Sequence, residues 1–101
     1  MARGDAWSSG NWQVREGAAD EFLKRWDEFA HWIKDRVPGF EHGRLLRDVN
    51  DPNHFVSIAG WEDAKSRADW MAMPEFADFL NTCKELCDDF RPGMFEEVVS
   101  V

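Results

Sequence analysis

Residues 54–61 read His-Phe-Val-Ser-Ile-Ala-Gly-Trp, and this stretch decides the fold. It is rich in β-branched and aromatic residues, which are typical of strands. Successive side chains of a strand point to opposite faces, so the odd-numbered positions from Phe55 to Trp61 share one face and His54, Val56 and Ile58 share the other. Both faces are mostly apolar. The sequence therefore predicts a strand that is covered on both sides.

Two further strands are predicted before this one. Residues 41–49 form a candidate strand, and the turn-rich Asn-Asp-Pro-Asn of residues 50–53 joins it to residues 54–61 as an antiparallel hairpin. Residues 11–15 alternate polar and apolar side chains, as a half-buried strand does. Residues 1–9 surround a lone tryptophan with small and polar residues, so we expect a flexible arm ahead of one domain over residues 10–101.

Helical spacing appears twice. Apolar residues from Phe22 to Ile33 recur at intervals of three and four, which predicts an amphipathic helix over residues 18–36. Asp63 is suited to cap a short helix, and Pro74 suits the first turn of another. We expect that last helix to continue through Cys87, and residues 94–101 to form a final strand.

The resulting order is β-α-β-β-α-β. This order is typical of the ferredoxin-like α+β fold, a four-stranded antiparallel sheet with its helices on one face. Because residues 54–61 are apolar on both sides, the other face of the sheet needs a cover from outside the domain. A second copy of the chain is the simplest cover, so we expect a homodimer built sheet on sheet.

Charge and length exclude several classes of protein. The 101 residues suit one hydrophobic core, and 20 acidic against 12 basic side chains give a net charge of −8. This balance argues against nucleic-acid binding, which needs clustered Lys and Arg. No apolar run approaches the roughly 20 residues that cross a membrane, and no secretory signal is visible. We therefore expect a cytoplasmic protein with reduced thiols.

Few residues offer chemistry of their own. His31, His42 and His54 form no short-spaced ligand set, so no metal site is predicted. Cys83 and Cys87 fall on one face of the expected helix and are predicted to be buried, reduced thiols. No phosphate-binding glycine pattern occurs, so no cofactor is expected. Six Trp and eight Phe, with no Tyr, suit a core, an interface or a pocket for a flat aromatic ligand.

Several short motifs carry a family resemblance over about nine-tenths of the chain. They are Trp-Gln-Val-Arg-Glu-Gly at residues 12–17, Asp20-Glu21-Phe22 with Trp26, Val37-Pro38-Gly39, Leu45-Leu46-Arg47-Asp48, the run at residues 51–57, and Trp61-Glu62-Asp63 followed by Trp70 and Pro74-Glu75-Phe76. With these motifs the chain resembles the antibiotic biosynthesis monooxygenase family, the dimeric α+β barrel proteins. Most of the motifs are packing residues, so they identify the fold family better than the reaction.

The resemblance implies a dimer with a pocket between the helices and the sheet of each protomer. One branch of the family degrades haem, using an Asn on the first strand, a Trp and a haem-ligating His. Trp70 matches the Trp, but the His would fall at Phe79 or Leu80, and the Asn position falls at Gly10. Asn11 lies one place out of register and would face the other way. Haem degradation of that type is therefore disfavoured.

Another branch oxidises polyaromatic phenols to quinones with molecular oxygen and no cofactor, and it suits the aromatic composition better. The resemblance then implies a cofactor-independent monooxygenase for a small aromatic or polycyclic phenol. Trp70 would stack on or orient the substrate, and Arg25 or Ser57 would hold a phenolate oxygen. No general base or other catalytic residue is assigned, so a non-catalytic ligand-binding dimer stays open as the alternative. The expected pocket residues are Trp12, Arg25, Phe29, Ser57, Trp70, Phe76 and Phe79.

Overall fold

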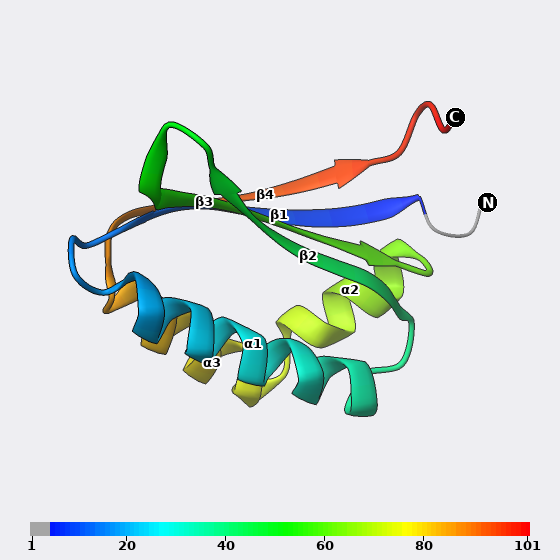
Figure 1. Ribbon diagram of the computed structural model, residues 1–101. Helices are drawn as coiled ribbons and strands as arrows, with labels where there is room; N and C mark the ends of the chain where they lie inside the picture. The colour runs from blue at the N-terminus through cyan, green and yellow to red at the C-terminus, as the bar shows by residue number, and fades with distance from the viewer. Residues whose placement is uncertain (1–4) are drawn as a thin grey trace.

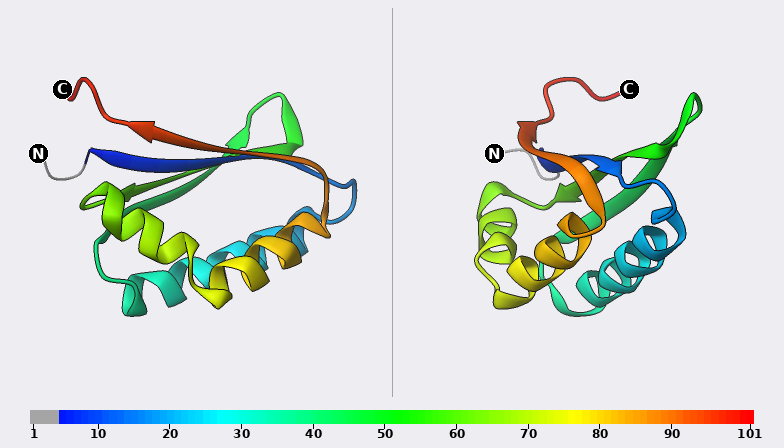
Figure 2. Two further views of the ribbon diagram at one scale, coloured as in Figure 1. Left: turned by 180° about the vertical axis from the view of Figure 1, so that it is seen from behind. Right: turned by 90° about the vertical axis from the view of Figure 1, so that its left-hand side faces the viewer.

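Seven elements follow one another along residues 5–101, which are the residues that this computed structural model describes (Figure 1). They are β1 (Ala6–Val14), α1 (Ala19–Arg36), β2 (Phe40–Asp48), β3 (Asp51–Trp61), α2 (Ala64–Met71), α3 (Pro74–Lys84) and β4 (Cys87–Glu96). The strands form one antiparallel sheet in the order β2-β3-β1-β4. All three helices cover the same face of the sheet in every view (Figures 1 and 2). The predicted ferredoxin-like α+β fold is confirmed.

The helix boundaries follow from local chemistry. Asp20 and Glu21 place negative charge in the first turn of α1, where it interacts favourably with the positive end of the helix dipole. After α1 the chain reverses at Gly39, whose φ of +85° favours glycine, and a Cβ there would lie 2.2 Å from Ser66 Oγ. The backbone N–H of Ser66 donates to Asp63 Oδ1 at 2.8 Å, so the predicted cap of α2 is confirmed.

The C-terminal part of the chain differs from the prediction. The helix that begins at Pro74 ends at Lys84, and Cys87 opens β4 instead of lying on the helix. Residues 91–93 do not end a helix but lie inside β4, where Pro92 pairs with Gly10. β4 is an edge strand, and an edge strand tolerates proline because half of its N–H groups have no partner in the sheet. The predicted strand over residues 94–101 is thus wrong beyond its first three positions.

The first strand also begins earlier than predicted. Ala6 pairs with both Trp61 and Glu96, so residues 6–9 belong to the sheet and not to an arm; residues 1–4 of that expected arm lie outside the described residues. These positions carry few strand-forming side chains. β1 lies between β3 and β4, and pairing on both sides overrides a weak local preference.

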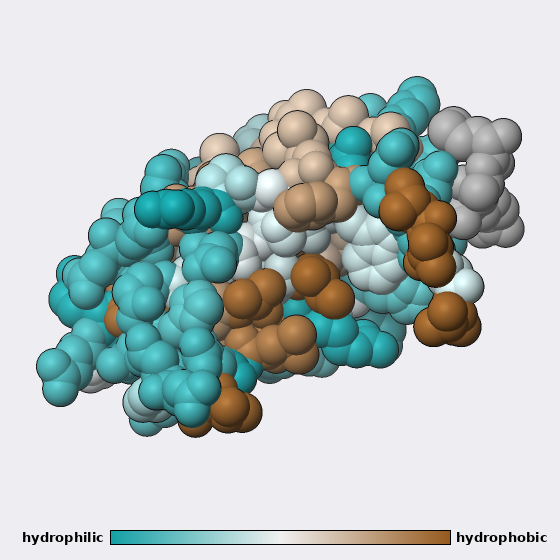
Figure 3. Space-filling view, turned by 90° about the horizontal axis from the view of Figure 1, so that it is seen from above, coloured by the Kyte–Doolittle hydropathy of each residue, from teal (hydrophilic) through white to brown (hydrophobic). Residues whose placement is uncertain are grey.

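The two faces of β3 divide as predicted. Phe55 and Trp61 are at most 1% exposed on the helix-facing side and belong to the hydrophobic core. On the other side, Val56 and Ile58 are only half-buried in a single chain. Figure 3 looks onto this outer face and shows apolar side chains gathered in its middle among polar ones. Among residues 5–101, no helix has both the length and the apolar character needed to cross a bilayer.

Candidate functional site

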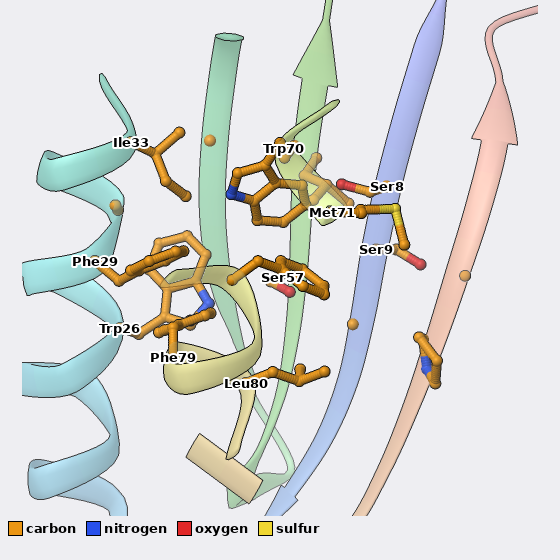
Figure 4. Close-up of a pocket in the computed structure, with 18 of the residues that line it drawn as sticks. Ser8, Ser9, Trp26, Phe29, Ile33, Ser57, Trp70, Met71, Phe79 and Leu80 are labelled. Atoms are coloured by element: carbon orange, nitrogen blue, oxygen red, sulfur yellow. The ribbon is translucent and has the colours of Figure 1, made fainter. Parts of the chain in front are cut away.

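A cavity of about 360 Å³ lies between the sheet and the three helices (Figure 4). This volume falls within the range of roughly 300–1,000 Å³ that is usual for small-molecule sites. Its walls come from every strand and every helix of the domain, so the whole fold positions them. None of the described residues that line it carries a charged or titratable side chain. The cavity therefore suits an uncharged, largely apolar ligand.

Aromatic rings form the helical wall of the cavity. Phe29 of α1 and Phe79 of α3 stack with 3.9 Å between ring centroids and 6° between ring planes. Trp70 of α2 meets Phe76 edge-on, with 4.5 Å between centroids. Offset stacks and edge-on contacts are the arrangements that aromatic rings prefer. A flat ring system entering the cavity would therefore meet ring faces and edges on this side.

The hydroxyls of Ser8 and Ser57 lie on the sheet side, opposite the rings of Phe29 and Phe79 (Figure 4). The indole N–H of Trp12 donates to Ser57 Oγ at 2.9 Å, and the indole N–H of Trp61 donates to Ser8 Oγ at 3.2 Å. Because each oxygen accepts from an indole, the hydroxyl hydrogen itself remains available. These hydroxyls are the polar groups best placed to meet a ligand's oxygen.

Gly10 makes room for one of these hydrogen bonds. It lies on β1 directly opposite Ser57, two positions before Trp12. A Cβ at residue 10 would lie 2.6 Å from Trp12 Nε1 and 2.8 Å from Ser57 Oγ. The close approach of Trp12 to Ser57 therefore requires glycine at this position.

The indole N–H of Trp70 is a further donor. Trp70 is 8% exposed, and its Nε1 is buried with no hydrogen-bond partner within residues 5–101. A buried donor left unpaired costs about 1–3 kcal/mol, so such groups are uncommon.

The structure brings six of the seven expected pocket residues to the cavity: Trp12, Phe29, Ser57, Trp70, Phe76 and Phe79. Arg25 is the exception, because it does not line this cavity but lies at the groove between α1 and α3. Its guanidinium pairs with Glu21 at 2.6 Å and with Glu28 at 3.4 Å, and its side chain is 43% exposed. One residue along a helix turns a side chain by about 100°, so Trp26 faces the cavity and Arg25 faces outward.

The sequence prediction missed other lining residues. Trp26 and Ile33 lie on the apolar stripe of α1, and that stripe is the signal that could have identified them. Ser8 fell in the expected arm, and Pro92 fell in the expected break after the last helix. These two were missed because β1 and β4 both begin earlier than predicted. Met94 lay in the expected last strand but was not predicted to line the pocket.

The two cysteines do not supply a reactive thiolate. Both are unpaired, and burial raises the pKa of Cys83 to about 12 and that of Cys87 to about 11. A thiol with such a pKa is almost wholly protonated near neutral pH, and the thiolate is the reactive form. The prediction that Cys83 and Cys87 share one face of a helix is wrong, because Cys87 lies on β4.

The histidines all lie away from the cavity. His54 places Nδ1 2.9 Å from Asp48 Oδ2 and Nε2 2.8 Å from Asn11 Oδ1. The hydrogen bond between His54 and Asp48 is the main reason that the pKa of Asp48 is lowered. His31 lies on the exposed side of α1, as expected, and His42 stacks on Trp7. Within residues 5–101, no three His, Cys, Asp or Glu side chains lie close enough together to hold a metal ion.

The fold of the whole chain is similar to that of several solved structures. SnoaB, a cofactor-independent oxygenase from Streptomyces nogalater, superposes with a TM-score of 0.88 in a mutant form, at 26% identity over 97% of both chains. A second SnoaB structure gives a TM-score of 0.82 at 27% identity, covering 96% of this chain and 97% of the other. A Deinococcus radiodurans protein with 16% identity and a TM-score of 0.84, covering 95% of both chains, shares the fold.

Sequence comparison reaches the same family. No curated protein matches the chain significantly. The family model for antibiotic biosynthesis monooxygenase, however, matches residues 9–82, which run from β1 into α3 and include most of the cavity wall. The chain therefore belongs to the antibiotic biosynthesis monooxygenase family.

Proposed function

We propose that this protein is a cofactor-independent oxygenase that uses molecular oxygen to oxidise a small, uncharged aromatic phenol or its keto tautomer. The observation that carries the proposal is the cavity itself, which is walled by rings and has no charged residue in its lining. Family membership and the likeness to SnoaB support an oxygenase. The choice of an aromatic, phenolic substrate rests on the shape and the lining of the cavity.

Such a substrate can supply the reactivity that the protein lacks. Loss of a proton from a ring CH₂ of the keto form gives an enolate, which passes one electron to O₂. The resulting substrate radical and superoxide combine to a peroxide at that carbon. Cleavage of the O–O bond, with loss of the second hydrogen from that carbon, leaves a carbonyl and releases water. Overall, R₂CH₂ and O₂ give R₂C=O and H₂O, and no external reductant is consumed.

The protein would then bind the substrate, stabilise its anion and exclude water. The stacked rings of Phe29 and Phe79 would contact the substrate with their edges, and the Ser57 hydroxyl, held by Trp12, would donate to the enolate oxygen. A hydrogen bond to a developing anion in a dry site is worth more than the same bond in water. We place Trp70 beside the substrate as an orienting ring, in keeping with its position in the cavity wall.

Deprotonation of the substrate would not use a residue of the cavity. The described lining residues offer no titratable side chain, so water or hydroxide would take the proton. The rate should then follow the ionisation of the substrate, not that of a residue of the enzyme. Two phenols that differ in pKa should show pH midpoints that differ by the same amount.

A homodimer is also part of the proposal. The outer face of the sheet is partly apolar, with Leu46 52% exposed and Phe95 59% exposed in the single chain. A second copy placed sheet on sheet would cover these side chains. Sedimentation should give twice the mass of one chain. We also keep a cytoplasmic location as a proposal, because both thiols are unpaired.

Oxygen uptake by chelator-treated protein with anthrone tests the proposed activity. We expect saturable uptake of one O₂ per anthrone, with anthraquinone as product, at a rate above that of anthrone in buffer. The second candidate function is a non-catalytic binding protein, which the lack of a titratable residue in the cavity favours. Quenching of tryptophan fluorescence by anthrone without accelerated uptake would establish that candidate and exclude the oxygenase.

A further inference from the structure

The floor of the cavity repeats one device on two neighbouring strands. On β3, Ser57 Oγ accepts the indole N–H of Trp12, and on β1, Ser8 Oγ accepts the indole N–H of Trp61. In each pair the serine lies on one strand and the tryptophan on the other, so the pairs cross in opposite directions. Both serines line the cavity.

Each pair leaves a single hydroxyl hydrogen unused. Within residues 5–101, neither serine has any further hydrogen-bond partner. A serine hydroxyl donates one hydrogen and accepts at two sites, and the indole occupies an acceptor site in each case. The remaining hydrogen can therefore be donated to a ligand's oxygen.

The sheet register sets the spacing between the two donors. Ser8 is directly opposite Ala59, and Ser57 is directly opposite Gly10. Ser8 and Ser57 are thus diagonal neighbours on one face of an antiparallel pair, which separates such positions by about 7–8 Å. Donors at this spacing suit two oxygens that lie on opposite sides of a ring.

The two serines also differ in depth. Ser57 is 9% exposed and lies in the middle of the sheet, beside the packed ring of Trp12. Ser8 is half-buried near the N-terminal end of β1, on the side where Met71 and Met94 line the cavity. Met71 is 36% exposed and Met94 is 61% exposed, so this side is the more open one. Oxygen and solvent reach Ser8 more readily than Ser57.

We propose that Ser57 and Ser8 form a two-point clamp for a para-dioxygenated ring. Ser57 holds the oxygen that the substrate already carries, and Ser8 donates to the oxygen that is introduced on the opposite side of that ring. This inference rests on the proposed function and adds to it the two side chains that would position the ring.

Binding of two ligands with the same skeleton tests the clamp without any turnover. Anthraquinone has two carbonyl oxygens on opposite sides of its central ring, whereas anthrone has one. Dissociation constants are measured under argon by quenching of tryptophan fluorescence. A net hydrogen bond is worth about 0.5–1.5 kcal/mol, so Ser8→Ala should weaken anthraquinone binding by about 2- to 12-fold and change anthrone binding by less than twofold. Ser57→Ala should weaken the binding of both ligands.

Asn11→Ala is the control. Asn11 lies on the same strand as Ser8 but three positions along it, so its side chain is on the outer face of the sheet and does not line the cavity; this variant should bind both ligands as the wild type does. If Ser8→Ala weakens both ligands equally, or neither, the clamp is wrong. Should Ser8→Ala not fold, the wild type decides, because binding of anthraquinone no tighter than that of anthrone also overturns the clamp.

The outcome is separable from that of the proposed function. Absence of oxygen uptake with the ligand preference intact would overturn the oxygenase and leave the clamp standing. Oxygen uptake with no dependence of anthraquinone binding on Ser8 would overturn the clamp alone.

Discussion

The rings of Phe29 and Phe79 stack almost in parallel, and the pair lies between two depressions of the molecule. Its members line the cavity, and they also line a shallower groove between α1 and α3 on the outside of the molecule. The stacked pair is therefore the partition between the cavity and the solvent on the helical side.

Phe29→Ala should open this partition. Because Phe29 is only half-buried, we expect a loss of stability of about 2 kcal/mol, below the usual range for a fully buried phenylalanine. Binding of anthrone should weaken at least tenfold, since water gains access and part of the aromatic wall is lost. Trp32→Ala is the control, because Trp32 stacks on Phe29 from the groove side and does not line the cavity. Equal losses of binding in the two variants would contradict the partition.

Gly10→Ala should break the hydrogen bond between Trp12 and Ser57. The new Cβ would overlap both atoms of that bond, so one of the two side chains must turn away. We expect anthrone binding to weaken, and the stability to fall by about 1–3 kcal/mol as the buried indole N–H loses its partner. Titration of the fluorescence and thermal unfolding measure the two effects. Unchanged binding in a folded Gly10→Ala protein would show that the Ser57 hydroxyl does not hold the ligand.

Arg25→Ala should leave ligand binding unchanged. The guanidinium pairs with two carboxylates on the exposed side of α1, and exposed pairs of this kind contribute about 0.3–0.5 kcal/mol each. We therefore expect a small loss of stability and a dissociation constant for anthrone within twofold of the wild type. A large loss of affinity would place Arg25 at the ligand after all.

Alkaline pH should destabilise the fold through Cys83. Its folded pKa of about 12 lies above the ordinary value of 9.0, so the unfolded chain loses this proton first as the pH rises. The stability contributed by the protonated thiol is complete below about pH 9 and is lost between there and about pH 12. Urea unfolding at pH 8 and pH 10 should show this loss, and Cys83→Ala should reduce it. If the free energy of unfolding of Cys83→Ala falls between pH 8 and pH 10 as much as that of the wild type, other groups cause the loss.

Local patterns predicted those parts of the fold that local chemistry determines. The apolar stripe of α1, the alternation of β3 and the Asp63 cap each depend on residues close together in the sequence, and each is confirmed. The start of β1 and the whole of β4 depend instead on pairing between segments that are distant in the sequence. Glycine and proline at these positions indicated breaks, because the sequence does not reveal which strand will lie at an edge.

The candidate site divides in the same way. A ring on the inner stripe of a helix, such as Phe29 or Phe79, could be expected to face a pocket between helix and sheet. The pairing of Ser8 with Trp61 could not, since it depends on a register across 53 positions of the chain. Arg25 shows the limit of residue chemistry alone, because a guanidinium suits a phenolate but the place of Arg25 on α1 turns it to the exposed side.

Filling the cavity and then measuring oxygen uptake tests the central claim most directly. Ala30 of α1 lines the cavity, so Ala30→Phe should occupy the space that a substrate needs, whereas Ala68→Phe places the same ring on the exposed side of α2. We predict that the wild type and Ala68→Phe accelerate oxygen uptake with anthrone, and that a folded Ala30→Phe protein does not. Uptake by Ala30→Phe at the wild-type rate would contradict the assignment of the reaction to this cavity.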